Sequence, residues 1–439
     1  MGEQYWSLSW QFLGVGLLGF FLAASLGAND VANSMGTSVG TGALSMRQAL
    51  ILAGILEFAG AVFFGDRVTQ TLTTQVAVPT VFATQPQILL LGMIAVLLAG
   101  AAWLQIATSL GLPVSSSHAV VGAIAGFTGV SAGLEAINWQ SLGTISLVWL
   151  ITPVVSGAIA FLLSLIIRYG ILHTPNPQFQ LQEWLPWLSL SLAIVFGSIV
   201  APVVSERFWA TQLTNQVIDQ LGNQEKITRY THNKEIIAAI CLLAVGIFLY
   251  SCWSGQGFKD RANLEATGEL EQQFGRLQRV SAGFVAFAHG ANDVGNAIAP
   301  LAIIWQILQT GQAPVNLLPT PLPVLILGGA GIVTGLGLWG KKVMGTIGQG
   351  ITPLRPSGGL IAEFATATTV LVASRWGLPV STSHALVGAV VGIGLIQGRQ
   401  ELDGKIIKNI ALAWLVTIPT TASLTVLIFE VFKYFLPLI

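Results

Sequence analysis

Long apolar stretches separated by short polar turns cover most of the 439 residues. A helix needs about 18 to 20 apolar residues to cross the hydrocarbon core of a membrane. The pattern predicts an all-α, polytopic membrane protein with about 12 hydrophobic segments, some of them re-entrant rather than spanning. These segments lie near 11–28, 48–65, 87–110, 112–130, 143–167, 185–204, 236–253, 281–304, 322–340, 358–376, 377–395 and 409–436.

Composition supports the assignment to membrane proteins and limits the kinds of binding partner to expect. Hydrophobic residues make up 53% of the chain and charged residues only 9%, whereas soluble domains carry about 25% charge. This excludes a soluble enzyme. The net charge is zero and no basic tract is present, so no nucleic-acid partner is expected. Cys241 and Cys252 have no metal-binding spacing, and a disulfide framework is not expected.

Three motifs occur twice, about 265 residues apart. Gly-Ala-Asn-Asp occurs at 27–30 and 290–293, Gly-Leu-Pro-Val-Ser-x-Ser-His at 111–118 and 377–384, and Trp-Leu-x-Thr at 149–152 and 414–417. A near-constant offset predicts an internal duplication. We expect a first transmembrane repeat unit at 1–204, a charged connecting region at 205–280 with one hydrophobic segment near 236–253, and a second repeat unit at 281–439.

Basic residues predict how the two units are oriented. Arg47 follows the first helix of the first unit, whereas Arg276 and Arg279 precede the first helix of the second unit. Equivalent loops therefore carry opposite charge bias. By the positive-inside rule, this favours inverted-topology repeats with the N-terminus outside.

The Gly-Ala-Asn-Asp motifs place carboxylates and amides inside apolar segments, where an unpartnered charge is unfavourable. Asparagines four residues apart share one face of a helix, and the preceding Gly27 and Gly290 are expected to weaken the helix. A broken helix with carboxylate and amide oxygens makes a cation site. The alternative is that the asparagines join helices by hydrogen bonds, but the matched acidic copies favour cations. The predicted ligands are Asn29, Asp30, Asn33, Asn292, Asp293 and Asn296.

The Ser-rich motifs each interrupt an apolar run with Gly and Pro before a new run begins. Ser and Thr are strong N-caps, and a helix N-terminus offers free N–H groups to an oxyanion. The alternative is ordinary capping after a loop, and the paired occurrence favours the anion site. Structural roles are expected for His118 and His384. The predicted anion-binding hydroxyls are Ser115, Ser116, Ser117, Ser381, Thr382 and Ser383.

Two glutamates, Glu57 and Glu363, also lie in apolar segments. Both precede Phe-Ala, but the repeat offset does not relate them. Glutamates inside a membrane are functional candidates, and Glu57 and Glu363 are predicted as further sodium ligands. The alternative is an ion pair with Arg67 or Arg375. His289 precedes only the second Gly-Ala-Asn-Asp copy, and this asymmetry argues against a role shared by both repeats.

The two Gly-Ala-Asn-Asp-Val-x-Asn and Pro-Val-Ser-x-Ser-His pairs resemble those of the inorganic phosphate transporter (PiT) family of cation-coupled symporters. The resemblance covers both halves of the chain. It implies two hairpins that meet at a central site, generally in a homodimer. It also implies phosphate bound by the Ser-rich motifs near Asp30 and Asp293, with Glu57 and Glu363 at the positions of essential membrane glutamates. Thr417 is expected to line the same site.

The sequence therefore predicts a secondary active transporter that imports inorganic phosphate by symport with sodium ions, through alternating access around a central site. It is expected in the plasma (cell inner) membrane, without cofactor or enzymatic activity. The alternatives are a proton-coupled phosphate or metal–phosphate symporter and a sulfate permease of the same fold. A channel would need a continuous polar stripe. A hydrolase would need one unique nucleophile, whereas these motifs are doubled.

Overall fold

The computed structural model describes residues 2–210, 266–314, 320–341, 343–344 and 351–435. Apart from short 3-10 and π-helical turns, the regular structure in these ranges is α-helical, as the apolar pattern predicts. The helices are α1 (Gly2–Gly40), α2 (Met46–Thr71), α3 (Pro86–Ser109), α4 (Ser116–Ala132), α5 (Trp139–Ile167), α6 (Pro177–Ala210), α8 (Ala266–Thr310), α9 (Leu322–Trp339), α11 (Pro356–Arg375), α12 (Thr382–Gln397) and α13 (Gly404–Phe435).

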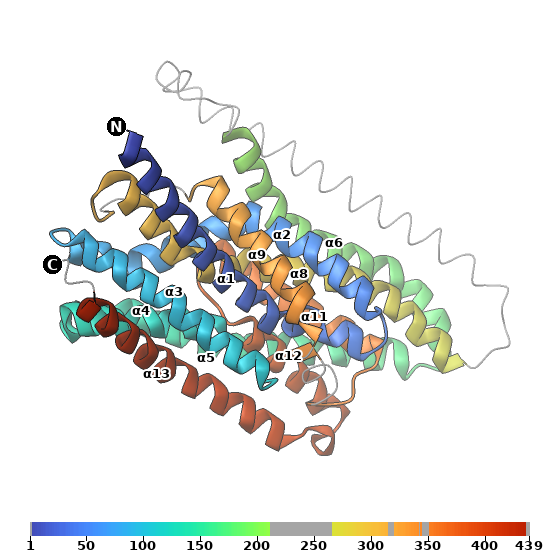
Figure 1. Cartoon of the computed structure of the whole chain (residues 1–439). Coiled ribbons are helices and arrows are strands. Elements are labelled where there is room, and N and C mark those ends of the chain that lie inside the picture. Colours follow the sequence, from blue (N-terminus) through green and yellow to red (C-terminus); the bar gives the residue numbers. More distant parts are fainter. Residues whose placement is uncertain (1, 211–265, 315–319, 342, 345–350, 436–439) are drawn as a thin grey trace.

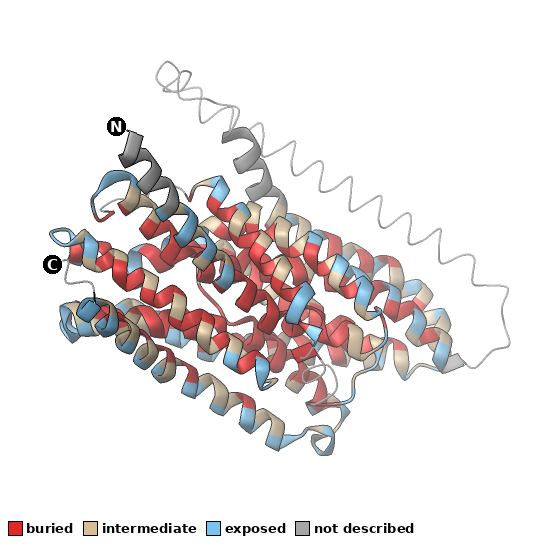
Figure 2. Cartoon of the chain, viewed as in Figure 1, coloured by how far each residue is buried: buried red, intermediate tan, exposed pale blue. Residues whose placement is uncertain are grey.

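Eight of the described helices are long and apolar enough to cross a membrane. This confirms the multi-pass membrane class, and eleven of the twelve predicted segments coincide with a helix. The remaining segment near 236–253, together with Cys241 and Cys252, lies outside the described residues. Buried residues fill the centre of the bundle, and exposed ones lie mainly at its surface (Figure 2).

Two helical hairpins contain the two shortest of the helices named above. α3 and α4 form one hairpin, and α11 and α12 form the other. α4 has 17 residues and α12 has 16, which is short for a spanning helix. Gly111 and Gly377 adopt φ values of +68° and +71° at the two hairpin tips, a conformation that glycine accommodates without strain. The Ser-rich motifs therefore lie at the hairpin tips.

The helices that carry Gly-Ala-Asn-Asp, α1 and α8, run antiparallel through the centre of the bundle (Figure 1). Gly19 near the start of α1 faces Leu301 near the end of α8. At the other end of α1, Thr41 donates a hydrogen bond to Gln278 Oε1, at 2.8 Å. Corresponding helices thus point in opposite directions, as inverted repeats require.

The predicted breaks at the Gly-Ala-Asn-Asp motifs are not found, because α1 and α8 continue through both. Their glycines instead permit close helix crossings. A Cβ placed on Gly27 would lie 2.0 Å from the carbonyl oxygen of Ile332 on α9, and one on Gly290 would lie 2.0 Å from that of Glu57 on α2. Helices do end at the two hairpin tips, where the chain carries the sequence Gly-Leu-Pro.

The two repeats interlock rather than lying side by side. α1 crosses α9 of the other repeat, and α8 crosses α2. The hairpin helices are exchanged in the same way, because α12 packs on α5 and α4 packs on α13. Each repeat therefore completes the packing of the other.

The start of α8 extends into the predicted connecting region. Residues 266–280 were expected to be an exposed connector because of their charges, yet they form the first turns of α8. Leu270, Phe274 and Leu277 are buried there. Their spacing of four and three residues is that of one helix face, and the acidic and basic residues between them obscure this pattern.

Candidate functional site

Asn29 fastens the tip of the first hairpin to α1. Its Nδ2 donates to Thr108 Oγ1 and to the Leu112 carbonyl, both at 3.1 Å, and its Oδ1 accepts from the Val114 amide at 3.3 Å. All three partners flank the turn between α3 and α4. The side chain therefore positions the tip, because its amide oxygen already accepts a backbone hydrogen bond.

Asn292 fastens the second hairpin in the corresponding way. Its Nδ2 donates to the Val380 carbonyl at 2.7 Å, and its Oδ1 accepts from the Val380 amide and from Ser374 Oγ, both at 3.3 Å. The two asparagines of each motif lie four residues apart on one continuous helix but contact different hairpins. The first asparagine of each pair contacts its own repeat's hairpin, whereas the second contacts the hairpin of the other repeat.

These second asparagines, Asn33 and Asn296, reach across the repeat boundary. Asn33 Nδ2 donates to Asp30 Oδ1 at 3.0 Å and lies 3.5 Å from Thr382 Oγ1. Asn296 Nδ2 donates to Asp293 Oδ1 at 3.3 Å and to Ser117 Oγ at 3.2 Å. Each thus joins the aspartate of its own motif to the Ser-rich tip of the opposite repeat.

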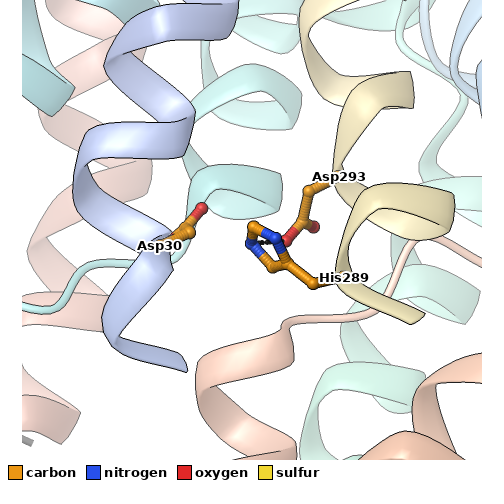
Figure 3. A group of neighbouring side chains, drawn as sticks. All are labelled: Asp30, His289 and Asp293. Carbon is orange, nitrogen blue, oxygen red and sulfur yellow. Dashed lines mark ion pairs between the residues drawn. The ribbon is translucent and has the colours of Figure 1, made fainter. Parts of the chain in front are cut away.

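Asp30 and Asp293 converge at the centre of the bundle, with His289 between them (Figure 3). Ligand-capable atoms of the three side chains all lie within 4.8 Å of one another, and all three residues are buried. His289 Nε2 is 2.8 Å from Asp293 Oδ2, one helical turn away on α8. The predicted meeting of the two aspartates is therefore present in the structure.

Glu57 extends this acidic cluster from α2. Its Oε2 lies 3.1 Å from His289 Nδ1, and its Oε1 accepts a hydrogen bond from Ser34 Oγ at 2.7 Å. The imidazole therefore has a carboxylate oxygen close to each ring nitrogen. A neutral ring carries only one N–H, so two such contacts are both favourable only when a second proton is shared within the group.

The hydroxyls of the Ser-rich motifs already have partners. Ser115 and Ser381 cap α4 and α12, since each side chain accepts from the amide three residues on, at 3.3 Å. Thr382 Oγ1 donates to Asp293 Oδ2 at 3.1 Å, and Ser383 Oγ lies 2.9 Å from Ser381 Oγ. The capping alternative is confirmed for the first residue of each motif, while Thr382 faces the acidic cluster.

The two hairpin tips touch. Ser117 Oγ donates to the Val380 carbonyl of the opposite tip at 2.9 Å. The N-termini of α4 and α12 therefore lie close together beside Asp30 and Asp293. First-turn amides have no acceptor within their own helix, and the helix dipole makes this end positive. The arrangement places anion-binding ends next to carboxylates that can hold cations.

Four buried oxygens in this cluster accept no hydrogen bond from the described residues. They are Asp30 Oδ2, Asn33 Oδ1, Asn296 Oδ1 and Glu57 Oε2, the last of which faces His289 Nδ1. An unpartnered acceptor in the interior is unfavourable, and carboxylate and amide oxygens are the ligands that hard cations prefer. Cations such as sodium therefore fit the donor set of this site.

Glu363 lies elsewhere, near the end of α1. Its Oε1 accepts from Thr37, Ser38 and Gln278 at 2.8, 2.6 and 2.9 Å, and its Oε2 accepts from Ser281 at 2.6 Å. These donors are uncharged, so they do not form the ion pair considered from the sequence. Thr37 is two turns along α1 from Asp30, or about 10 Å at 1.5 Å per residue. Glu363 thus forms a second acidic position outside the central cluster.

Thr417 makes contacts that differ from its predicted role. Its Oγ1 donates to the Ala413 carbonyl at 2.7 Å and accepts from Trp103 Nε1 at 3.2 Å. These bonds join α13 to α3 and do not involve the Ser-rich tips. These contacts therefore do not support the phosphate-binding role that the family resemblance suggested for Thr417.

His118 and His384 form a paired core between the repeats. Each Nδ1 contacts the backbone carbonyl of a tryptophan, Trp414 at 3.2 Å and Trp149 at 3.0 Å respectively. The two imidazoles lie edge to face with their centroids 4.8 Å apart. This packing fits the structural role expected from the sequence.

His289 is the residue that sequence reasoning set aside. Its asymmetry between the repeats suggested no shared function, yet it lies between all three central carboxylates. One signal could have found it, because it precedes Asp293 by four residues and so must share its helix face. Ser34 and Ser281 carried no comparable signal, since their contacts depend on helix packing.

Comparison with known proteins agrees with this architecture. A family model described as the phosphate transporter family matches residues 26–425. The chain is 38% identical over 426 residues to a candidate phosphate permease of Haemophilus influenzae, with 97% of each chain covered. It is also 38% identical over 424 residues to the chloroplastic inorganic phosphate transporter 2-1 of Arabidopsis thaliana, covering 94% of this chain and 70% of that one.

A solved structure described as the sodium-dependent phosphate transporter has a similar fold. The TM-score is 0.84 at 36% sequence identity, and the match covers 97% of this chain and 99% of that one. The helical bundle, its re-entrant hairpins and its buried polar centre define an integral membrane transporter. The chain belongs to the phosphate transporter family.

Proposed function

We propose that the protein imports inorganic phosphate together with sodium ions, through alternating access to a site enclosed by the two hairpin tips. One observation carries this proposal: the N-termini of α4 and α12 meet beside the buried Asp30–His289–Asp293 cluster. Anion-binding and cation-binding groups are thus within one enclosure, as coupled binding of a phosphate and its accompanying cations requires.

In this proposal, cations bind at Asp30, Asn33 and Asn296, where buried acceptor oxygens lack donors, and at Asp293 beside them. Asn29 and Asn292, which the sequence also suggested as ligands, position the tips instead. Phosphate binds to the first-turn amides of α4 and α12 and to hydroxyls that now bond to Asp293 or to one another. Cation binding frees these hydroxyls, because the ion replaces them as the partner of the carboxylate.

Charge balance favours coupling to at least two cations. Moving one charge against a potential of 100 mV requires about 2.3 kcal/mol, so a phosphate dianion entering a negative interior requires about 4.6 kcal/mol. Two sodium ions cancel this work. Asp30, Glu57 and Asp293 around a doubly protonated His289 have two net negative charges, which two bound cations would neutralise.

Alternating access cannot follow the division of the sequence into halves. Backbone-to-backbone crossings join α1 to α9 and α8 to α2, so the two halves do not move as separate bodies in this proposal. Separating the repeats would break these contacts. A moving unit must therefore contain helices from both repeats, such as the two hairpins together with the helices that they contact.

Uptake of labelled phosphate into proteoliposomes tests the proposal. Wild-type protein should take up phosphate only with an inward sodium gradient. Asp30→Asn should lower the rate at least about tenfold, which corresponds to 1.4 kcal/mol of lost stabilisation, because it removes one of the cluster's charges. Glu401→Gln removes an exposed carboxylate and serves as the control. Full sodium-dependent uptake by Asp30→Asn would refute the cation role of this residue.

Excess unlabelled sulfate in the same assay decides between phosphate and sulfate. Phosphate retains a proton near neutral pH and can donate it to a carboxylate such as Asp293, whereas sulfate cannot. We therefore expect little competition by sulfate. Equal competition by sulfate and phosphate would favour the sulfate permease.

His289 favours one second candidate, a proton-coupled metal–phosphate symporter. Imidazole beside carboxylates is a donor set that suits transition metals better than sodium, and its atoms lie within reach of both aspartates. Uptake driven by a proton gradient without sodium, and dependent on a divalent metal, would establish this alternative.

Residence in the cell inner membrane and assembly as a homodimer complete the proposal. The family resemblance supports the dimer. Light scattering on the purified protein, with the contribution of detergent subtracted, measures the protein mass of the complex. A mass of one chain would refute the dimer.

A further inference from the structure

A second cavity lies at the face of the bundle where α5 and α12 end and where α6, α8 and α11 begin. Its volume is about 460 Å³, whereas a water molecule in the liquid takes up about 30 Å³. Its lining residues do not include any residue of the Asp30–Asp293 cluster. The cavity is therefore a separate feature with space for far more than a hydrated ion.

Two arginines line this cavity. Arg168 Nη1 donates to the Ile396 carbonyl, which leaves the other N–H donors of its guanidinium group for a ligand. Arg355 is exposed, and its guanidinium group makes no hydrogen bond or ion pair with the described residues. Glu271 also lines the cavity, but its carboxylate accepts from the Ser357 amide and hydroxyl, both at 2.9 Å. The polar side of the cavity is therefore positively charged.

Ser164 provides an independent sign of a ligand. It lies one turn before Arg168 on α5, is only 6% exposed, and lines the cavity. Its Oγ makes no hydrogen bond within the described part of the chain. A buried hydroxyl without a partner is unfavourable, and a polar group in the cavity would satisfy it.

The remaining walls are mostly apolar. Leu270, Ile361, Ile393 and Ile396 contribute from three different helices. An inorganic anion would gain nothing from these side chains, whereas an acyl chain would gain the free energy of burying apolar surface. Basic pockets between membrane helices near the headgroup level are typical sites for anionic lipids.

We propose that this cavity binds one anionic phospholipid, with its phosphate between Arg168 and Arg355 and the start of an acyl chain along Ile361 and Ile393. α11 and α12 of the second repeat and α5 and α6 of the first repeat all contribute lining residues. Occupancy would therefore hold the second hairpin against helices of the first repeat. This effect on transport rests on the proposed function, whereas the binding itself does not.

Native mass spectrometry of the full chain tests the binding directly. The protein is purified in detergent with equal amounts of phosphatidylglycerol and phosphatidylcholine. We expect one phosphatidylglycerol to be retained per chain, and retention to fall about tenfold in Arg168→Gln/Arg355→Gln, as for a loss of 1.4 kcal/mol of binding free energy. Ile396→Trp, which fills the cavity without removing charge, should reduce retention as well. Lys408→Gln, exposed and outside the cavity, should have no effect.

Three results would overturn this proposal. They are equal retention of both lipids, retention that the arginine and tryptophan variants leave unchanged, and displacement of the lipid by millimolar inorganic phosphate. The last result would identify a small-anion site instead. Because none of these measurements uses transport, full sodium-dependent uptake by Asp30→Asn, which would refute the proposed cation role, would leave the lipid result intact.

Discussion

At the scale of single residues, the buried acids differ in how the fold satisfies them. Glu363 accepts four hydrogen bonds from uncharged donors. Glu57 accepts one from Ser34 and faces His289. Both oxygens of Glu363 therefore accept hydrogen bonds from fixed donors. The contact between Glu57 and His289, in contrast, depends on whether the imidazole nitrogen carries a proton.

This difference predicts the effect of removing the charge at Glu363. In Glu363→Gln, an NH2 group must face at least one hydroxyl or amide that now donates. We expect unfolding free energy to fall by about 1 to 3 kcal/mol, the usual penalty for an unsatisfied buried group. Thermal unfolding in detergent measures this.

Glu430→Gln provides a matched control for Glu363→Gln. Glu430 is 47% exposed and lies 3.6 Å from Lys433, and exposed pairs of this kind contribute little. If Glu363→Gln unfolds at the temperature of Glu430→Gln, the four hydrogen bonds do not stabilise the fold as described.

Some of these residues could be predicted from the sequence and some could not. A carboxylate in an apolar segment is visible without a structure, so Asp30, Asp293, Glu57 and Glu363 could be identified. Their partners could not, because Thr37 and Gln278 reach Glu363 only through the crossing of α1 and α8. Asn29 was predicted as a cation ligand, and its hydrogen bonds to the hairpin tip were not foreseen. Helix periodicity gives a side chain's direction but not its neighbour.

At the scale of helices, the motif glycines show how propensity and packing compete. Glycine weakens an isolated helix, and on that ground breaks were expected at Gly27 and Gly290. Both helices continue because tertiary packing compensates: each glycine allows another backbone to approach closely. The interruption occurs at the hairpin tips, where proline removes a helical hydrogen bond.

The crossings predict that alanine will have opposite effects at glycines that lie at a crossing and at a glycine that does not. Gly27→Ala and Gly290→Ala place a methyl group against a carbonyl oxygen, and we expect each to destabilise by about 1 to 3 kcal/mol, as overpacking does. Gly14→Ala, in the same helix as Gly27 but with nothing within 4 Å, should stabilise by up to about 1 kcal/mol. Thermal unfolding compares the three variants. Stabilisation by all three would mean that the close crossings do not exist.

A tryptophan on α5 also fastens a hairpin of the other repeat. Trp149 Nε1 donates to the Pro379 carbonyl at 3.0 Å, whereas the equivalent Trp414 Nε1 has no partner among the described residues. Trp149→Phe should lower the unfolding free energy by about 0.5 to 1.5 kcal/mol more than Trp414→Phe, because only the first loses a hydrogen bond. Equal losses in the two variants would show that the two tryptophans are equivalent in solution.

At the scale of the whole molecule, duplication was visible in the sequence but interlocking was not. Motif spacing predicted two repeats, and loop charges predicted their opposite orientations, consistent with antiparallel α1 and α8. Spacing does not indicate which helices pack together. The exchange of α12 onto α5 and of α4 onto α13 depends on three-dimensional packing, which motif spacing does not record.

Interlocking also explains how one site can be built from two copies of each motif. Each asparagine pair contacts both repeats. Asn33 links Asp30 to the tip of the second repeat, and Asn296 links Asp293 to the tip of the first. The central claim is therefore that both tips and both aspartates bind one phosphate and its cations together.

Cryo-electron microscopy of the purified protein in sodium phosphate tests this claim most directly. We predict tetrahedral density within hydrogen-bonding distance of the first-turn amides of both α4 and α12, with cation density at Asp30 and Asp293, and no phosphate density when choline replaces sodium. Phosphate bound at one tip alone, or away from both aspartates, would contradict the account.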